Sequence, residues 1–481
     1  MLRKDMSDPR ATSPSQALSP PGWARAADFA AILFAILALT IPVSGGVRAL
    51  VWGWHLKIVS PFRLLLFAAA IVVARHVLVG QPSLFRSLRE AIVSWTRSAP
   101  LRTAALAAAG TRPVMFAVGY LTVIMLGYAP GAQPFRDFES ELLNLPLRWD
   151  AGWYLGIATT GYSYIDSAGP DAQQNVVFFP AYPLLVRVVA RLAGNSAAAY
   201  VVGATVTTVV LFVLALAYVY RLARERLTDD QAAATLWLLA AYPFSLFYGA
   251  IYTESLFLLG IAGAFYHFGR REFGRAAWWG LLVGLTRPNG LLLSVPLAIT
   301  VLEGRGERPV GARIRGAPAA CAAIAMPVAG AALYSAFIWR LAGSPFAWAA
   351  GHAAWGRHYE GLSHLVATRY GFIASVGLLE YVSREPYDLL NGLGAVFVLA
   401  AVWPVLRRFG PAYAAFILIN ILPPLAAGGL MSAGRFSSVL FPAFLWLGAA
   451  VPARHRAGWI ATFAAIQAFN AALFYTWRPL F

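Results

Sequence analysis

The chain has 481 residues, of which 59% are hydrophobic and only 12% are charged. Soluble domains carry about 25% charged residues, so this composition excludes an ordinary soluble protein and indicates a membrane protein. The formal net charge of +17 does not indicate nucleic-acid binding, because most arginines fall in short loops between apolar runs and no binding motif accompanies them. The single cysteine, Cys321, excludes a disulfide within the chain.

The N-terminal part of the chain differs from the rest. Residues 1–22 are rich in Ser, Pro and Ala, which predicts a disordered cytoplasmic tail. Apolar runs at about Ala27–Val43 and Leu64–Leu78 predict two membrane spans, and an arginine-rich stretch follows them. We therefore expect residues 23–112 to form two extra spans with a basic cytoplasmic loop, and residues 113–481 to form the main domain.

Apolar runs and short polar loops alternate through this main domain. Clear runs of spanning length are predicted at about residues 113–128, 198–220, 232–248, 319–339, 390–405, 412–425, 436–451 and 459–475. A further helix follows Glu254, and a helix broken in its middle covers residues 276–301. The helix that carries Arg187 and Arg191 on one face is expected to lie in the interface or to re-enter the membrane. The predicted fold is an all-α polytopic bundle of about 12–13 spans.

Loop charges predict the orientation of this bundle. Arginines gather in the loops Arg86–Arg112, Arg221–Arg226 and Arg305–Arg315, and the positive-inside rule places those loops in the cytoplasm. The intervening loops are then external. They carry Asp150, Glu254, the stretch from His352 to His358, and Arg435.

The first large external loop contains the most suggestive motif of the chain. Arg148, Trp149 and Asp150 are followed closely by Trp153 and Tyr154. A carboxylate among aromatic rings at the mouth of a bundle can take a proton from a hydroxyl while the rings hold a sugar. The alternative is an ordinary interfacial belt of Trp and Tyr with a solvated aspartate.

Other polar side chains fall on the same predicted side or at the helix break. They are Glu254, Arg287, Asn289, His352, Trp355, Arg357 and Arg435. An arginine at a break inside the membrane is costly without a partner, so Arg287 is a functional candidate. Glu254 can orient a substrate hydroxyl or pair with an arginine.

A metal site is not expected. His352, His358 and His364 are six residues apart, which does not place them on one helical face. Loop histidines near lipid headgroups are the simpler interpretation.

At this point the sequence resembles a known family. The motifs, in chain order, are Arg148-Trp149-Asp150-Ala151 with Tyr154, Phe178-Phe179-Pro180-Ala181-Tyr182-Pro183, Tyr252-Thr253-Glu254-Ser255-Leu256-Phe257, Arg287-Pro288-Asn289-Gly290 and Gly434-Arg435-Phe436. They look like the PIG-V family, which comprises GPI mannosyltransferase 2 and its bacterial relatives, membrane glycosyltransferases of the GT-C type. The resemblance runs from about Pro113 to the C-terminus. It implies that residues 113–481 are a GT-C catalytic domain and that the donor is a polyprenyl-phosphate-mannose.

The chemistry of such a transfer assigns roles to the candidate residues. Asp150 is expected to be the general base, and Arg287 and Arg435 are expected to hold the phosphate. Aromatic faces suited to the sugar and the prenyl chain are Trp149, Trp153, Tyr154, Trp348 and Trp355. Two alternatives stay open, namely a GT-C transferase for another polyprenyl-linked sugar and a lipid flippase or carrier.

The expected surroundings follow from the same interpretation. The Arg- and Ala-rich composition with compact loops is typical of a bacterial protein, so we expect an inner-membrane enzyme whose active site faces the periplasm. No cofactor or metal is expected, because a lipid-phosphate donor needs none. The expected partners are the membrane and the polyprenyl-phosphate sugar lipid.

Overall fold

The computed structural model describes residues 21–44, 47–51, 54–58, 60–79, 93–94, 98–166, 169, 172–303 and 318–480. The chain divides into two compact units, residues 1–96 and 97–481. Most of the predicted tail lies outside the described residues, and so do Arg86, Arg89, Arg97 and the whole loop Arg305–Arg315.

The first unit is a helical hairpin. Helices α1 (Gly22–Ser44) and α2 (Pro61–Leu78) pack against each other. The connection predicted as a loop contains an antiparallel strand pair, β1 (Val47–Val51) and β2 (Trp54–Ile58). Arg75, near the end of α2, is buried and pairs with Asp28 of α1 at 2.8 Å. A buried guanidinium needs an acidic partner, and here that partner lies on the other helix. The ion pair therefore joins α1 to α2.

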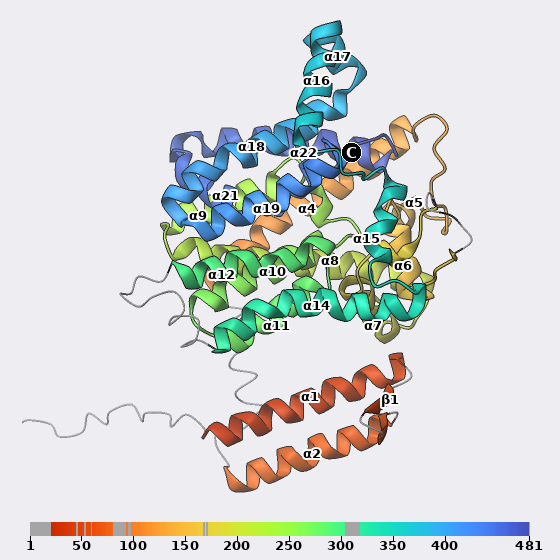
Figure 1. Cartoon of the computed structure of the whole chain (residues 1–481), viewed down its shortest axis with the longest axis vertical. Helices are drawn as coiled ribbons and strands as arrows, with labels where there is room; N and C mark the ends of the chain where they lie inside the picture. Colours follow the sequence, from red (N-terminus) through yellow and green to blue (C-terminus); the bar gives the residue numbers. More distant parts are fainter. Residues whose placement is uncertain are drawn as a thin grey trace, which may run out of the picture. The chain divides into compact units, whose positions relative to one another are not determined.

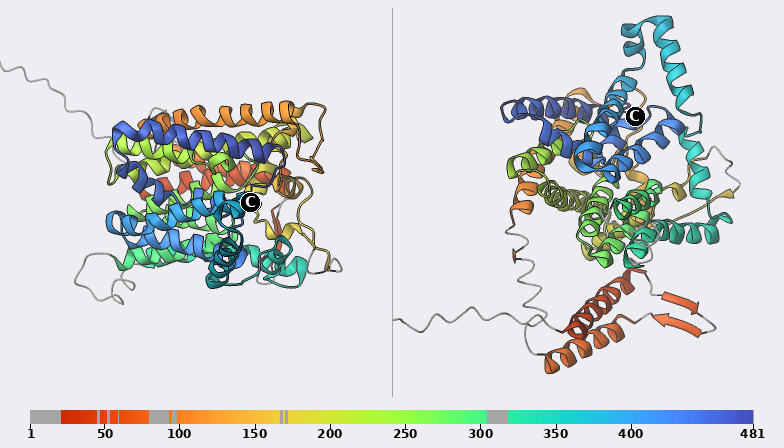
Figure 2. Two further views of the ribbon diagram at one scale, coloured as in Figure 1. Left: turned by 90° about the horizontal axis from the view of Figure 1, so that it is seen from above. Right: turned by 60° about the vertical axis from the view of Figure 1, so that its left-hand side comes forward.

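All the regular secondary structure in the described part of the second unit is helical. Its elements are α4 (Ala99–Leu126), α5 (Glu141–Asn144), α6 (Ala151–Thr159), η2 (Asn175–Val177), α7 (Ala181–Leu192), α8 (Ala197–Arg224), α9 (Asp229–Ala241), η3 (Ser245–Tyr248), α10 (Glu254–Gly269), α11 (Phe273–Gly284), η4 (Pro288–Leu293), α12 (Ser294–Leu302), α14 (Pro318–Ala342), α15 (Ala347–Ala350), η5 (Gly351–Trp355), α16 (Leu362–Val376), α17 (Leu378–Arg384), α18 (Pro386–Phe409), α19 (Pro411–Gly428), α20 (Ala433–Ser438), α21 (Phe441–Ala450) and α22 (Ala453–Tyr475). The long helices lie side by side, and the short helices α5, α6 and α15 gather at one end of the bundle (Figures 1 and 2).

The multi-pass architecture is confirmed, but with fewer spans than the sequence predicted. Seven described helices are long and apolar enough to cross a membrane, or eight if the bent pair α16–α17 counts as one. Several predicted spans are short helices, among them α9, α10 and α21. A span needs about 20 residues, and these helices have 13, 16 and 10. Apolar composition alone could not separate spanning helices from short helices buried by their neighbours.

Local sequence explains where several helices begin and turn. Ser196 caps α8 by accepting from the amide of Ala199, and Thr228 forms a capping box with Gln231 at the start of α9. Gly410 joins α18 to α19 with a φ of +102°, a backbone conformation open mainly to glycine.

Helix α4 corrects one prediction. The sequence placed Arg112 in a cytoplasmic loop before a span starting at residue 113, whereas α4 begins at Ala99 and Arg112 lies buried within it. The Arg112 guanidinium donates to the carbonyls of Ser245 and Ala240, the latter at 2.8 Å. These carbonyls lie at the end of α9 and at the start of η3, and backbone groups inside a membrane bundle must find partners. Arg112 therefore lies inside a helix, where it binds the backbone of a neighbouring segment, and not in a loop.

Three breaks interrupt the predicted apolar runs. The break predicted near Arg287 is confirmed, since α11 ends at Gly284 and η4 begins at Pro288. Two further breaks were not predicted. They separate α9 from η3 and α20 from α21, and a proline, Pro243 or Pro442, stands at each. Proline cannot continue the helical hydrogen-bond pattern. Both unpredicted breaks adjoin segments that enter the polar site.

Candidate active site

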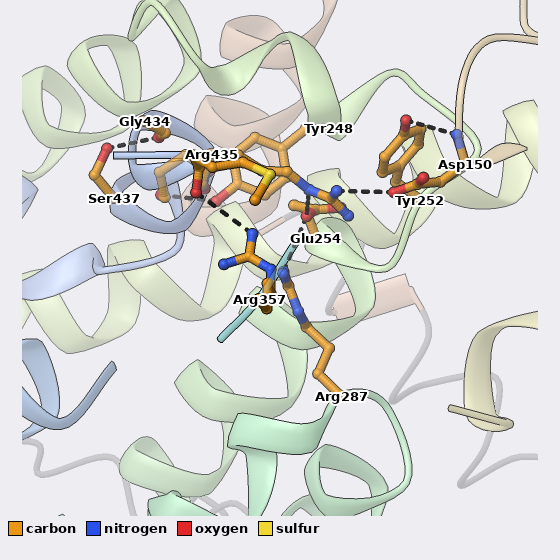
Figure 3. Close-up of polar contacts among 11 residues, drawn as sticks. Asp150, Tyr248, Tyr252, Glu254, Arg287, Arg357, Gly434, Arg435 and Ser437 are labelled. Carbon is orange, nitrogen blue, oxygen red and sulfur yellow. Dashed lines mark hydrogen bonds and ion pairs between the residues drawn. The ribbon is translucent and has the colours of Figure 1, made fainter. Parts of the chain in front are cut away.

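Four side chains from distant parts of the sequence form one buried ion network (Figure 3). The Arg435 Nη1 donates to Asp150 Oδ2 at 3.0 Å, and its Nε donates to Glu254 Oε1 at 2.5 Å. The Arg287 Nη1 donates to the same Glu254 oxygen at 2.9 Å. The side chain of Glu254 is fully buried, whereas that of Asp150 is 21% exposed. Asp150 is thus the carboxylate of the pair that a substrate can reach.

The position of Asp150 is fixed from both sides. Trp149, just before it, has a φ of +52°, which turns the chain sharply into α6. The Asp150 amide donates to the hydroxyl of Tyr252 at 3.0 Å. Arg435 occupies Oδ2, while Oδ1 accepts no hydrogen bond from the described residues. One carboxylate oxygen is therefore held and the other is open to a proton donor.

Arg435 depends on the glycine before it. A Cβ on Gly434 would lie 2.2 Å from the ring of Phe244, so only glycine fits there. The Gly434 amide donates to Asn391 Oδ1 at 2.9 Å. The Arg435 guanidinium then lies 4.4 Å from the centre of the Tyr252 ring. The Gly-Arg-Phe motif thus holds an arginine between an aromatic face and two carboxylates.

The helix break at Arg287-Pro288-Asn289-Gly290 also requires a glycine for steric reasons. A Cβ on Gly290 would lie 2.1 Å from the carbonyl oxygen of Val283, so η4 packs directly on the backbone of α11. Asn289 donates to Asn420 Oδ1 of α19 at 2.8 Å. Asn289, predicted to bind substrate, thus secures η4 in the structure. Its neighbour Arg287 reaches into the ion network.

A third arginine, Arg357, comes from the loop that joins η5 to α16. The Arg357 and Arg287 guanidinium carbons lie 5.1 and 5.5 Å from the centre of the same Phe436 ring. Burial, and then the like charges of Arg435 and Arg287, lower the pKa of Arg357 to about 10. Arg357 therefore stays charged at neutral pH, beside two other cations.

Nearby His352 adds no charge at neutral pH. Burial, and then the neighbouring Arg357, lower the pKa of His352 to about 4. Three guanidinium groups and two carboxylates thus leave one excess positive charge in the site. Such an excess favours an anionic ligand.

Aromatic side chains line one flank of the network. The rings of Trp153 and Phe178 are stacked with centroids 5.8 Å apart, and Trp355 meets both rings edge-on. Tyr154 is buried against Phe178 and Tyr252. The structure thus brings the predicted Trp153, Tyr154 and Trp355 together.

Two predicted binding residues have other surroundings. Trp348 packs edge-on against Phe179 and donates to Ser335, within a separate hydrophobic cluster. Arg148 is completely buried. It pairs with Glu141 at 3.1 Å and donates to the carbonyl of Tyr475 at 2.8 Å. This geometry does not support substrate contact by either residue, and Arg148 instead ties the Asp150 loop to the end of α22.

The histidines considered for a metal site have different surroundings. His364 of α16 pairs with the exposed Glu360 just before that helix, whereas His352 is partly buried in η5. Within the described ranges, no three His, Cys, Asp or Glu side chains form a group suited to a metal ion.

Sequence reasoning missed several residues of this site. Tyr252, Phe178 and Phe436 belong to the motifs quoted above. Their aromatic side chains could have marked them as candidates. Asn391 and Trp477 lie far from any motif and carried no signal in the sequence, because only the fold brings Asn391 to Gly434 and Trp477 to Trp149.

A reachable aspartate, an excess of cations and aromatic walls in a multi-pass bundle fit a membrane glycosyltransferase. Residues 133–304 of the chain match the family model described as mannosyltransferase (PIG-V). The match confirms the resemblance and indicates a mannosyltransferase. It contains Asp150, Glu254 and Arg287, while Arg357 and Arg435 lie beyond it.

Other comparisons add little. A search of curated proteins found no match. One solved structure that the chain matches is the archaeal oligosaccharyltransferase AglB from Archaeoglobus fulgidus, in complex with an inhibitory peptide and a dolichol-phosphate. The sequence identity is 13% and the TM-score is 0.35. The match covers 76% of this chain and 55% of the oligosaccharyltransferase chain. A likeness at this TM-score carries no argument.

Proposed function

We propose that the protein transfers mannose from a polyprenyl-phosphate-mannose to a membrane-associated acceptor, with Asp150 as the general base. The observation that carries this proposal is the excess positive charge around Asp150. Three arginines face two carboxylates, and each carboxylate has one oxygen without a hydrogen bond from the described residues. Only Asp150 is also partly exposed, because the side chain of Glu254 is fully buried. A lipid phosphate is an anion that fits such a site at the membrane.

The reaction assigns each group a task. Asp150 Oδ1 takes the proton of the acceptor hydroxyl, whose oxygen forms a bond to the mannose anomeric carbon. The bond from that carbon to the phosphate oxygen breaks, and the polyprenyl phosphate leaves with the electron pair. Arginines stabilise the negative charge that develops on the leaving phosphate.

The three arginines divide this work. Arg435 already binds two carboxylates, so it positions Asp150 rather than the phosphate. Arg287 gives one donor to Glu254, and Arg357 makes a single long bond, at 3.4 Å, to the carbonyl of Met431. Arg287 and Arg357 therefore have donors left for the phosphate. In this proposal Arg357 takes the phosphate-binding role that the sequence analysis predicted for Arg435.

The lipid phosphate is tested by Arg357→Lys. Lysine keeps the charge but loses the planar pair of donors that matches a phosphate. A lost charge-assisted hydrogen bond corresponds to a rise of about 10- to 100-fold in the KM for the donor lipid. The measurement is steady-state transfer at varied polyprenyl-phosphate-mannose, with Arg340→Lys, at an exposed position on α14, as the matched control. An unchanged donor KM in Arg357→Lys would exclude Arg357 from the phosphate site.

We also propose that this site faces outward, as the loop charges predict. In a Cys321→Ser background, Asp166→Cys should react with a membrane-impermeant thiol reagent in intact cells. Arg226→Cys should react only after the membrane is opened. Both positions are exposed. If Arg226→Cys were labelled in intact cells and Asp166→Cys were not, the proposed orientation would be wrong.

A further inference from the structure

A second group of charged side chains lies at the end of the bundle opposite the candidate active site. Helix α10 begins at Glu254 in the ion network and runs for 16 residues, so it ends about 24 Å away from that network. Arg270 follows it directly. Arg221 lies in the last turn of α8, which is long enough to cross the membrane, and Arg275 lies in the first turn of α11. Three helices thus contribute an arginine to this end of the bundle.

One carboxylate and one aromatic ring bring these arginines together. The Glu272 side chain lies 2.8 Å from that of Arg275 and 3.6 Å from that of Arg270. The guanidinium carbons of Arg221 and Arg270 lie 5.8 and 5.4 Å from the centre of the same Tyr266 ring. Three cations therefore surround a single carboxylate and a single ring.

The carboxylates nearby do not cancel this charge. Glu272 is held in place by a buried histidine, since His267 Nδ1 lies 2.6 Å from Glu272 Oε2 and His267 Nε2 lies 3.0 Å from the Tyr218 hydroxyl. The other carboxylate, Glu225, has Arg226 as its first charged neighbour. Glu225 and Arg226 therefore balance each other, and Glu272 is left as the counter-charge of the cluster.

A fourth arginine occupies a strained position in the same turn. The amides of Arg271 and Glu272 donate to the carbonyls of Phe268 and His267, each at 2.9 Å, which closes the end of α10. Glycine usually stands where Arg271 lies in such a turn, and Arg271 adopts a φ of +60° there. Strained residues of this kind concentrate at functional sites. We call the four residues the distal arginine cluster, namely Arg221, Arg270, Arg271 and Arg275. Even without Arg221, three arginines face one carboxylate, and such an excess favours an anion.

An exposed tryptophan adjoins the distal arginine cluster. Trp278 follows Arg275 by three residues, so both side chains lie on one face of α11. Trp278 is 65% exposed, whereas the next residue, Trp279, packs edge-on against Tyr218. An exposed tryptophan beside cations is typical of the membrane–water interface. The cluster therefore lies at the level of lipid headgroups, with an apolar surface next to it.

We propose that the distal arginine cluster binds the headgroup phosphate of an anionic phospholipid. Guanidinium groups form charge-assisted hydrogen bonds with phosphate oxygens, and the acyl chains lie along Trp278 and α11. With the orientation proposed above, the lipid belongs to the cytoplasmic leaflet, whose surface is negatively charged. Neither the mannose donor nor Asp150 takes part in this binding.

The test titrates the purified protein in detergent micelles with dioleoylphosphatidylglycerol and follows the midpoint of thermal unfolding. A ligand of the folded state raises this midpoint, and the titration gives an apparent Kd. The combined change of Arg221→Gln, Arg270→Gln and Arg275→Gln should raise that Kd by at least about tenfold, because charge-assisted contacts are lost. Dioleoylphosphatidylcholine, which has no net charge, should leave the wild-type midpoint almost unchanged.

A matched control removes three arginines elsewhere at the same end of the bundle. The carbonyl of Arg408 accepts from Arg226, so α18 ends there, and α22 begins beside the start of α9. Arg407, Arg408 and Arg454 are exposed, and their combined replacement by Gln should leave the Kd nearly unchanged. An equal rise in both triple variants would show a general attraction between the membrane and the basic surface, and it would overturn the site.

Trp278→Ala tests the lipid separately from the charge. It keeps every arginine and removes an exposed side chain, so it also decides the proposal if the triple variant does not fold. The Kd for dioleoylphosphatidylglycerol should rise in Trp278→Ala, and an unchanged Kd would overturn the lipid assignment. Inorganic phosphate at the same concentration should not shift the wild-type midpoint. A shift equal to that caused by the lipid would identify a soluble phosphate as the ligand and would also overturn the assignment.

Discussion

Replacement of Asp150 by Asn should reduce transfer by about 10²–10⁴-fold, the usual contribution of a general base. Asparagine keeps the size of the side chain and can still accept a hydrogen bond from Arg435. It cannot take a proton from the acceptor hydroxyl. The variant should therefore bind the donor lipid normally and lose turnover. The measurement is kcat together with the donor KM in purified membranes.

The matched controls lie on the same loop. Glu139→Gln and Asp166→Asn remove the charge of two exposed carboxylates outside the ion network. Both should retain nearly full transfer. If Asp150→Asn kept more than about a tenth of wild-type turnover, the loss would be too small for a general base. Glu254 would then be the next carboxylate to test.

Arg435→Lys should cost about 10²-fold or more in turnover with little change in donor KM. Arg435 uses two different nitrogens to hold Asp150 and Glu254 at once, and a single ammonium group cannot reproduce this fork. Asp150 would then be misplaced, and errors of about 1 Å can cost about 10²-fold in rate. The expected split, a lower kcat at constant donor KM, distinguishes positioning from phosphate binding.

The control for Arg435→Lys is Arg384→Lys in the exposed α17. Thermal unfolding of both variants shows how much of any loss is structural. Normal kcat in Arg435→Lys would show that Asp150 keeps its position without the guanidinium. A large rise in donor KM instead would return Arg435 to the phosphate site.

Much of the architecture could be predicted from composition and loop patterns. Apolar runs located most helices, and the Arg-Pro-Asn-Gly sequence located the break before η4, because proline and glycine act locally. Helices α9 and α21 were taken for spans, since a short buried helix and a spanning helix have the same apolar composition. Arg112 was misplaced for a related reason. Its carbonyl partners at residues 240 and 245 are visible only in the folded bundle.

The candidate site was predicted in part. Local motifs identified Asp150, Glu254, Arg287 and Arg435 as candidate site residues, and the structure brings all four together. The motifs could not show which arginine has donors to spare, because that depends on contacts between distant segments. For the same reason the sequence predicted substrate binding by Arg148, although its donors are taken by Asn144, Glu141 and Tyr475. The contact between Trp477 and Trp149 likewise forms only where the chain after α22 meets the Asp150 loop.

The most direct test of the central claim is an assay with radiolabelled polyprenyl-phosphate-mannose in membranes that contain the wild-type protein or Asp150→Asn. The account predicts that wild-type membranes move the label into a glycosidically linked product and that Asp150→Asn membranes do not. Movement of the intact donor lipid across the membrane without any labelled product would contradict the account and would favour a lipid carrier.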